Sequence, residues 1–215
     1  MKIQGIIFDM DGTLVDSEGD GFHYLEVVFG RLGVALTARE EEYIYGRSWD
    51  EAFEFIRSQY PSVTLSNQEI KDLYLDEKLG VSRPLKEFPG AAEAVRKLYL
   101  RYPLALVSGS YQREVDHVVH GLGIGQCFAM AMGIEGYGES KPSPRGFLAA
   151  AAHMGVDPGN VVVFEDSEPG IEAALRAGMT VVAVTCTQVV NPSHAKAHQR
   201  LADWRQLPWD LDAWI

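Results

Sequence analysis

Two aspartates lie near the start of the chain, two residues apart. Asp9 follows the apolar run 6–8, and Asp11 is followed at once by Gly12. A carboxylate at the end of a buried strand can attack phosphorus as a nucleophile, and a second one at this spacing can protonate a leaving oxygen and then activate water. The pair also offers hard oxygen ligands for Mg²⁺. Asp and Gly favour turns as well, so the pair alone is also compatible with a capped strand end.

Two further motifs have the character of phosphate-binding groups. Ser108 and Gly109 follow the apolar run 104–107, and a hydroxyl beside a backbone N–H at a strand end can hold an anion. Lys141 stands in the segment Ser-Lys-Pro-Ser-Pro. Because the prolines fix the backbone around it, this lysine is a candidate for neutralising a phosphate. Taken singly, each motif also fits a plain turn or a solvated lysine.

A second pair of acids ends a later apolar run. Glu165 and Asp166 follow residues 161–164, as Asp9 and Asp11 follow the first run. Two acidic clusters that converge from separate strands on one sheet edge repel each other unless a cation lies between them. The sequence therefore predicts a Mg²⁺ site.

The stretch FDMDGTLVDSE closely resembles the first motif of the haloacid-dehalogenase-like (HAD) superfamily. The variant is similar to the branch of β-phosphoglucomutase and phosphoglycolate phosphatase, and the three other motifs follow in the family's order over nearly the whole chain. The resemblance implies that Mg²⁺ is held by the carboxylates of Asp9 and Asp166 and by the backbone carbonyl of Asp11. Glu165 would contribute directly or through water.

The motifs in this order favour a phosphatase that hydrolyses a small phosphorylated metabolite, of the sugar phosphate or phosphoglycolate type. Asp9 would form an aspartyl-phosphate, while Asp11 would protonate the leaving alcohol and then deprotonate the attacking water. Ser108, Gly109 and Lys141, together with Mg²⁺, would stabilise charge on the phosphoryl oxygens.

The elements that must position these motifs alternate between helix and strand from about residue 90 onward. We expect strands at 6–8, 104–107, 129–134, 161–164 and 180–184, and helices at 91–102, 112–120, 144–154 and 169–177. This alternation predicts an α/β fold, a Rossmann-like doubly wound and mostly parallel sheet. Trp204, Trp209 and Trp214 of the tail are expected to pack the last elements onto the sheet.

Residues 17–88 predict helices without intervening strands. One helix would be capped by Ser17 and end at Gly33, a second would open at the capping box of Ser48, and a third would start at residue 66 or 67. We therefore expect an α-helical cap domain at 17–88, inserted into a catalytic core of residues 1–16 and 89–215. The resemblance implies that this cap opens and closes over the site.

A β-phosphoglucomutase-like phosphomutase is the main alternative, because it would share every core motif. Such mutases carry a His soon after the first motif, where this chain has Gly21 and where His23 is displaced by two residues. They also carry Gly-x-Ser-Arg in the cap, where Trp49 replaces the arginine. These departures favour hydrolysis. His23, Arg47 and Trp49 are candidates for substrate contacts, and each is equally explained as a core or surface residue of the cap.

Two other functions fit the motifs less well. A phospho-receiver switch also combines acids, a hydroxyl and a lysine around Mg²⁺, but receiver domains are shorter, lack the helical insertion and carry the phospho-acceptor on a later strand. This non-enzymatic role is the remote alternative. A dehalogenase is disfavoured because Asp11 and the following Gly-Thr match the phosphatase pattern.

Composition limits the partners and the compartment. The 215-residue chain has a formal net charge of −11, which argues against nucleic acid as a partner. No stretch approaches a membrane span, and acids interrupt the first apolar run, so we expect neither a membrane anchor nor a signal peptide. Cys127 and Cys186 have no metal-like spacing, which fits a reducing compartment. We expect a cytoplasmic monomer or weak homodimer.

Overall fold

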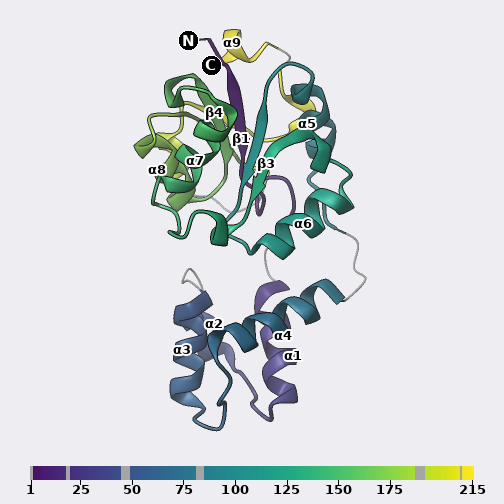
Figure 1. The fold of residues 1–215 in the computed structure, drawn as a ribbon, viewed down its shortest axis with the longest axis vertical. Coiled ribbons are helices and arrows are strands. Elements are labelled where there is room, and N and C mark those ends of the chain that lie inside the picture. The colour runs from purple at the N-terminus through teal and green to yellow at the C-terminus, as the bar shows by residue number, and fades with distance from the viewer. Residues whose placement is uncertain (1, 18–19, 45–48, 81–84, 187–191, 209) are drawn as a thin grey trace. The chain divides into compact units, whose positions relative to one another are not determined.

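The computed structural model describes residues 2–17, 20–44, 49–80, 85–186, 192–208 and 210–215 (Figure 1). The chain forms two compact units. The larger unit comprises Met1–Asp16 and Leu85–Ile215, and the smaller unit comprises Ser17–Pro84.

The larger unit is built on a parallel sheet with the strand order β3-β2-β1-β4-β5-β6 within the described residues. The strands are β1 (Gly5–Phe8), β2 (Leu104–Val107), β3 (Phe128–Met132), β4 (Val161–Glu165), β5 (Thr180–Val184) and β6 (Gln199–Leu201). Every residue of β1, β2, β4 and β5 is buried, as expected for strands that are covered on both faces. The predicted α/β fold with a parallel sheet is confirmed.

Helices cover both faces of this sheet (Figure 1). The helices of the larger unit are α5 (Ala91–Tyr99), α6 (Gln112–Gly121), α7 (Arg145–Met154), α8 (Glu168–Arg176) and the short α9 (Leu211–Trp214). Apolar residues of α5 and α6 pack on one face with Phe8 and Phe164, and those of α7 and α8 pack on the other with Ile7 and Val163. Alternate residues of the central strands thus enter two separate cores.

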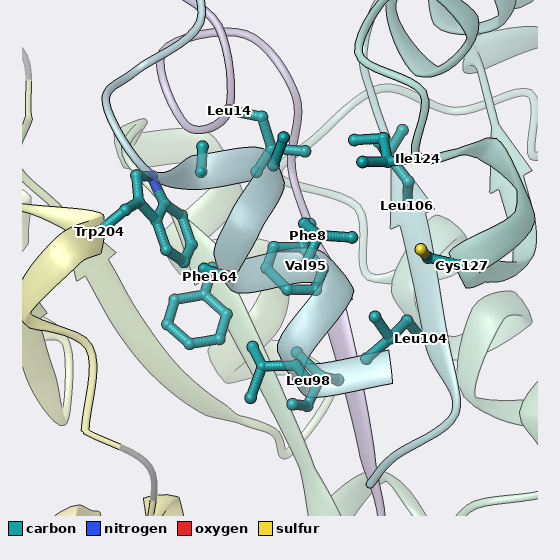
Figure 2. Packing of buried hydrophobic residues seen from close by; sticks show 14 of the residues in the cluster. Phe8, Leu14, Val95, Leu98, Leu104, Leu106, Ile124, Cys127, Phe164 and Trp204 are labelled. Carbon is teal, nitrogen blue, oxygen red and sulfur yellow. The ribbon is translucent and has the colours of Figure 1, made fainter. Parts of the chain in front are cut away.

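The first of these cores contains an aromatic stack (Figure 2). Phe8 lies 5.2 Å from Phe164 between ring centroids, and Trp204 lies 5.0 Å from Phe164. Since Phe8 immediately precedes Asp9 and Phe164 immediately precedes Glu165, this packing fixes the ends of the two strands that carry acids. Trp204 therefore packs a late segment of the chain onto the sheet, as the sequence suggested.

The two segments of the larger unit that lead toward the smaller unit are paired with each other. The N–H of Asp16 donates to the carbonyl of Lys86 at 2.8 Å, and that of Phe88 donates to the carbonyl of Leu14 at 3.0 Å. Phe88 is also buried in the core of the larger unit. Residues 85–88, which the sequence analysis assigned to the cap, consequently lie with the larger unit.

The described residues of the smaller unit form helices joined by turns and loops, with no strand among them. Its helices are α1 (Asp20–Arg31), α2 (Ala38–Ile44), α3 (Trp49–Gln59) and α4 (Asn67–Gly80). Ser66 caps α4 in a reciprocal arrangement with Glu69, while the expected capping residue Ser48 lies outside the described residues. Sequence analysis missed α2, although Thr37 and Glu40 form its capping box.

None of the helices within the described ranges is both long enough and apolar enough to cross a membrane.

Candidate active site

The site lies at the carboxyl ends of the three central strands of the larger unit. Asp9 follows β1, Ser108 follows β2, and Glu165 is the last residue of β4. Because β1 pairs with β2 on one side and with β4 on the other, this edge is the switch point where open α/β sheets bind ligands. The N–H of Asp9 donates to the carbonyl of Phe164 at 2.9 Å, so that adjacent strands hold the acids in register.

Lys141 joins the two acidic motifs. Its Nζ lies 2.5 Å from Asp9 Oδ1 and 2.7 Å from Glu165 Oε1, and it also donates to the carbonyl of Val107 at 3.3 Å. Burial disfavours the charged amine, but the two carboxylates outweigh this effect and raise the pKa of Lys141 above its ordinary value. The two carboxylates therefore favour the charged form of this largely buried lysine, which is the form that neutralises a phosphate.

Three carboxylates gather around this one ammonium. Oxygens of Asp9, Glu165 and Asp166 all lie within 4.8 Å of one another. Burial raises the pKa of Asp9 above its ordinary value despite the neighbouring Lys141. Burial, followed by the charge of Glu165, raises the pKa of Asp166 to about 8.

This group has the chemistry of a site for a hard divalent cation. Its donors are all carboxylate oxygens, which such cations prefer. Burial disfavours the ionised forms of Asp9 and Asp166, and a bound cation would favour these forms again. The residues present thus fit a metal ion, as the sequence predicted.

Two glycines make room for the acids. At Gly12, where φ is +77°, a Cβ would lie 2.1 Å from Asp166 Oδ2, and at Gly170 a Cβ would lie 1.6 Å from Glu165 Oε1. Neither distance is possible for a real side chain, so only glycine lets the turn after β1 and the first turn of α8 approach the carboxylates. Thr13, next to Gly12, donates its hydroxyl to Asp166 Oδ1 at 3.1 Å.

The second acid of the first motif contacts the loop after β2. Asp11 Oδ2 accepts hydrogen bonds from Ser108 Oγ at 3.1 Å and from Ser110 Oγ at 2.7 Å. The N–H of Ser110 in turn donates to Ser108 Oγ at 3.0 Å. Ser110 was not among the predicted site residues. The repeated serine in Val-Ser-Gly-Ser was the available signal, because residues two apart can face the same side.

The other predicted residue of this loop is Gly109. Among the described residues other than Gly109 and its two chain neighbours, no heavy atom lies within 4 Å of the position that a Cβ would take there. Close packing therefore does not require glycine at this position, and its predicted role in binding phosphate rests on its backbone N–H.

The predicted specificity residues belong to the smaller unit. His23 is exposed and lies 3.9 Å from Glu26 between Nδ1 and Oε2. The ring of Trp49 packs 4.8 Å from that of Tyr74, between centroids. Arg47 lies outside the described residues. The two units are described separately, so a contact between these three residues and the substrate stays a prediction.

The family model of the haloacid dehalogenase-like hydrolases matches residues 3–178. The chain belongs to this family. The match includes all four motifs, from Asp9 to Asp166, and it confirms the family that the first motif indicated. It also establishes the chain as an enzyme of a hydrolase family.

Relatives with assigned names are moderately similar. A phosphorylated carbohydrates phosphatase from Thermotoga maritima is 30% identical, over 82% of this chain and 82% of the relative. A bifunctional riboflavin kinase/FMN phosphatase from Arabidopsis thaliana is 31% identical over 83% of this chain, and the match spans only about half (48%) of that longer protein.

The solved structure of a candidate β-phosphoglucomutase from Thermotoga maritima has the same fold. It superposes with a TM-score of 0.75 and is 27% identical, covering 94% of this chain and 96% of the other. The structural neighbours thus include the branch of the family that the sequence resembles.

Proposed function

We propose that this chain is a Mg²⁺-dependent phosphatase that hydrolyses a small phosphorylated metabolite through an aspartyl-phosphate on Asp9. The observation that carries the proposal is the cluster of the buried Asp9 and Glu165 with the partly buried Asp166 and Lys141 at the switch point of the sheet. Two of the relatives compared above are named as phosphatases, one of phosphorylated carbohydrates and one of FMN. These names support a phosphate monoester as the substrate class.

The metal would be held by the carboxylates of Asp9 and Asp166 and by the backbone carbonyl of Asp11, with Glu165 binding directly or through water. When bound, Mg²⁺ supplies positive charge that offsets the repulsion between the carboxylates and an anionic phosphate. The ammonium of Lys141 supplies further positive charge, since it already lies 2.5 Å from Asp9 Oδ1.

In the first step, a carboxylate oxygen of Asp9 attacks phosphorus and the P–O bond to the substrate alcohol breaks. Asp11 gives its proton to the departing oxygen. Ser108 and the N–H of Gly109, which follow β2, would hold the phosphoryl oxygens. A carboxylate needs no base to become a nucleophile at neutral pH.

In the second step, Asp11 takes a proton from water, and the water oxygen attacks the aspartyl-phosphate. Inorganic phosphate leaves, and Asp9 returns as a carboxylate. Both steps use Asp11 in opposite protonation states, first as the acid and then as the base. The hydrogen bond that Asp11 accepts from Ser110 holds its carboxylate in one orientation for both transfers, while the Ser108 hydroxyl is free to turn from Asp11 to the phosphoryl group.

A phosphomutase is the alternative, favoured by the similarity to the candidate β-phosphoglucomutase. At Gly21, where such mutases carry a His, an added Cβ would lie 3.5 Å from Trp49 Cη2. Trp49 itself stands where they carry an arginine. The absence of both mutase residues supports hydrolysis. His23, Arg47 and Trp49 remain our proposed specificity residues, and a cap that closes over the site remains a proposal.

A substrate panel tests the proposal. Phosphate release is measured with Mg²⁺ from sugar phosphates, phosphoglycolate, phosphogluconate and nucleoside monophosphates, with Asp9→Asn as the blank. β-Glucose 1-phosphate is followed in parallel for conversion to the 6-phosphate. Release that needs both Mg²⁺ and Asp9 supports a phosphatase. Isomerisation with little free phosphate would make the enzyme a mutase, and neither reaction on any compound would contradict the proposal.

A further inference from the structure

The family model ends at residue 178, but a later segment reaches back to the site. His194 lies in a 3₁₀ turn, Pro192–Lys196, and is buried at 7% exposure. Its Nε2 lies 2.7 Å from the backbone carbonyl oxygen of Asp166. Because a carbonyl only accepts hydrogen bonds, Nε2 must carry the hydrogen and donate it. The imidazole thus fixes the backbone of Asp166.

A second residue of the same segment fixes the carboxylate of Asp166 indirectly. Trp204 is 2% exposed and donates its Nε1–H to the carbonyl of Thr13 at 2.9 Å, while its ring packs on Phe164 (Figure 2). Thr13 is fully buried and donates its hydroxyl to Asp166 Oδ1 at 3.1 Å. Backbone and side chain of Asp166 are therefore both held by groups that the late segment positions.

The segment is itself anchored to the sheet. The Nε of Arg200 on β6 donates to the carbonyl of His194 at 3.2 Å, and Arg200 is paired with Ala183 of β5. The 3₁₀ turn also packs against α8. The imidazole is consequently part of a fixed framework and not of a free loop.

We propose that His194 is a positioning residue that orients Asp166 for the metal, with Trp204 as its partner in the same role. The inference rests on the proposed function, in which Asp166 is a metal ligand. Oxygens of Asp9, Glu165 and Asp166 lie within 4.8 Å of one another, and ionised carboxylates this close repel one another, so a metal site at this place needs Asp166 to be held in position. Groups that orient a ligand in this way raise metal affinity because the site is formed in advance.

The test measures Mg²⁺ affinity directly, by calorimetric titration of the whole protein without substrate. His194→Leu fills the space of the imidazole without a donor, whereas His194→Gln has a similar size and keeps an N–H donor. Removal of such an outer contact typically costs about 10- to 100-fold in metal affinity. We expect a loss in this range for His194→Leu and recovery of most of it in His194→Gln.

A histidine nearby provides the matched control. His198 Nδ1 accepts a hydrogen bond from the N–H of Val181 at 3.1 Å, so it supports the sheet edge and not the site. His198→Ala should lower the thermal midpoint and leave Mg²⁺ affinity unchanged. Should His194→Leu not fold, Trp204→Phe keeps a ring and removes only the indole donor, and it should also weaken Mg²⁺ binding.

The outcomes separate this inference from the proposed function. If the wild type binds Mg²⁺ and His194→Leu binds it equally well, or if His198→Ala weakens binding as much as His194→Leu does, the positioning role is wrong while the phosphatase proposal stands. If Trp204→Phe has to replace His194→Leu, unchanged affinity in that variant overturns the role in the same way. A wild type that binds no Mg²⁺ overturns both.

Discussion

Replacement of Lys141 by methionine removes the ammonium that contacts both Asp9 and Glu165. The two acids have side-chain exposures of only 8% and 1%, so their charges are left in a poorly solvated place. Loss of one partner of a buried ion pair costs about 3–5 kcal/mol. For a chain of this size each kcal/mol lowers Tm by about 2–4 °C, which gives an expected drop of roughly 6–20 °C in the metal-free protein at pH 8.

The pH dependence of this drop follows from the shifted pKa values. The folded-state pKa of Lys141 is raised, so its stabilising charge is fully present at pH 8 and is lost only well into the alkaline range. The folded-state pKa of Asp9 is raised as well, so acidification lets Asp9 become neutral in the variant. The loss of Tm in Lys141→Met should therefore be smaller at pH 5 than at pH 8.

The assay is thermal unfolding with a chelator at both pH values, combined with kcat for phosphate release at saturating Mg²⁺. We expect kcat to fall about 100- to 1,000-fold, as when one donor to a developing negative charge is removed. Lys97→Met is the control, because the side chain of Lys97 is 40% exposed and pairs with Glu93 one turn earlier on α5. This variant should leave both quantities nearly unchanged. The reasoning is refuted if Lys141→Met does not lower Tm, or if it lowers Tm equally at both pH values.

Three further predictions concern neighbouring residues. Gly170→Ala would place a Cβ 1.6 Å from Glu165 Oε1. It should therefore lower the free energy of unfolding in urea by about 1–3 kcal/mol and weaken Mg²⁺ binding. Wild-type values for both quantities would contradict the predicted clash. Ser110→Ala removes the 2.7 Å hydrogen bond to Asp11 and should reduce kcat about tenfold for sugar phosphates. The loss should be smaller for p-nitrophenyl phosphate, because its leaving group needs no proton. Equal losses for both substrates would argue against a role of Ser110 in orienting Asp11. The pKa of Asp166 is raised from 3.8 to about 8, so the metal-free protein loses stability as the pH rises from about 4 through 8. Mg²⁺ should therefore raise Tm more at pH 8 than at pH 6. Equal increases in Tm at the two pH values would contradict this prediction.

The sequence predicted the central strands well for a physical reason. Strands 104–107 and 180–184 have the predicted bounds, because continuous apolar runs between turn residues are typical of strands buried on both faces. The edge strand β6, Gln199–Leu201, was missed because it is three residues long and mostly polar. Its pairing with β5 depends on tertiary structure and not on a local pattern.

The candidate site was predictable only as far as its motifs are local. Asp9, Glu165 and Asp166 come together as expected, since the carboxyl ends of neighbouring parallel strands share one edge. Ser110 and His194 were not predicted. Their contacts with Asp11 and Asp166 span 99 and 28 residues and arise from how the loops pack, which no spacing in the sequence reveals.

The most direct test of the central claim is to trap the covalent intermediate. The enzyme is mixed with Mg²⁺ and a substrate identified by the panel, quenched with acid within one turnover, and digested for peptide mass spectrometry. The account predicts one phosphoryl group on Asp9, absent from Asp9→Asn and from enzyme treated with a chelator. A full turnover of phosphate release with no phosphoryl group on Asp9 at any quench time, or with the group on another residue, would contradict it.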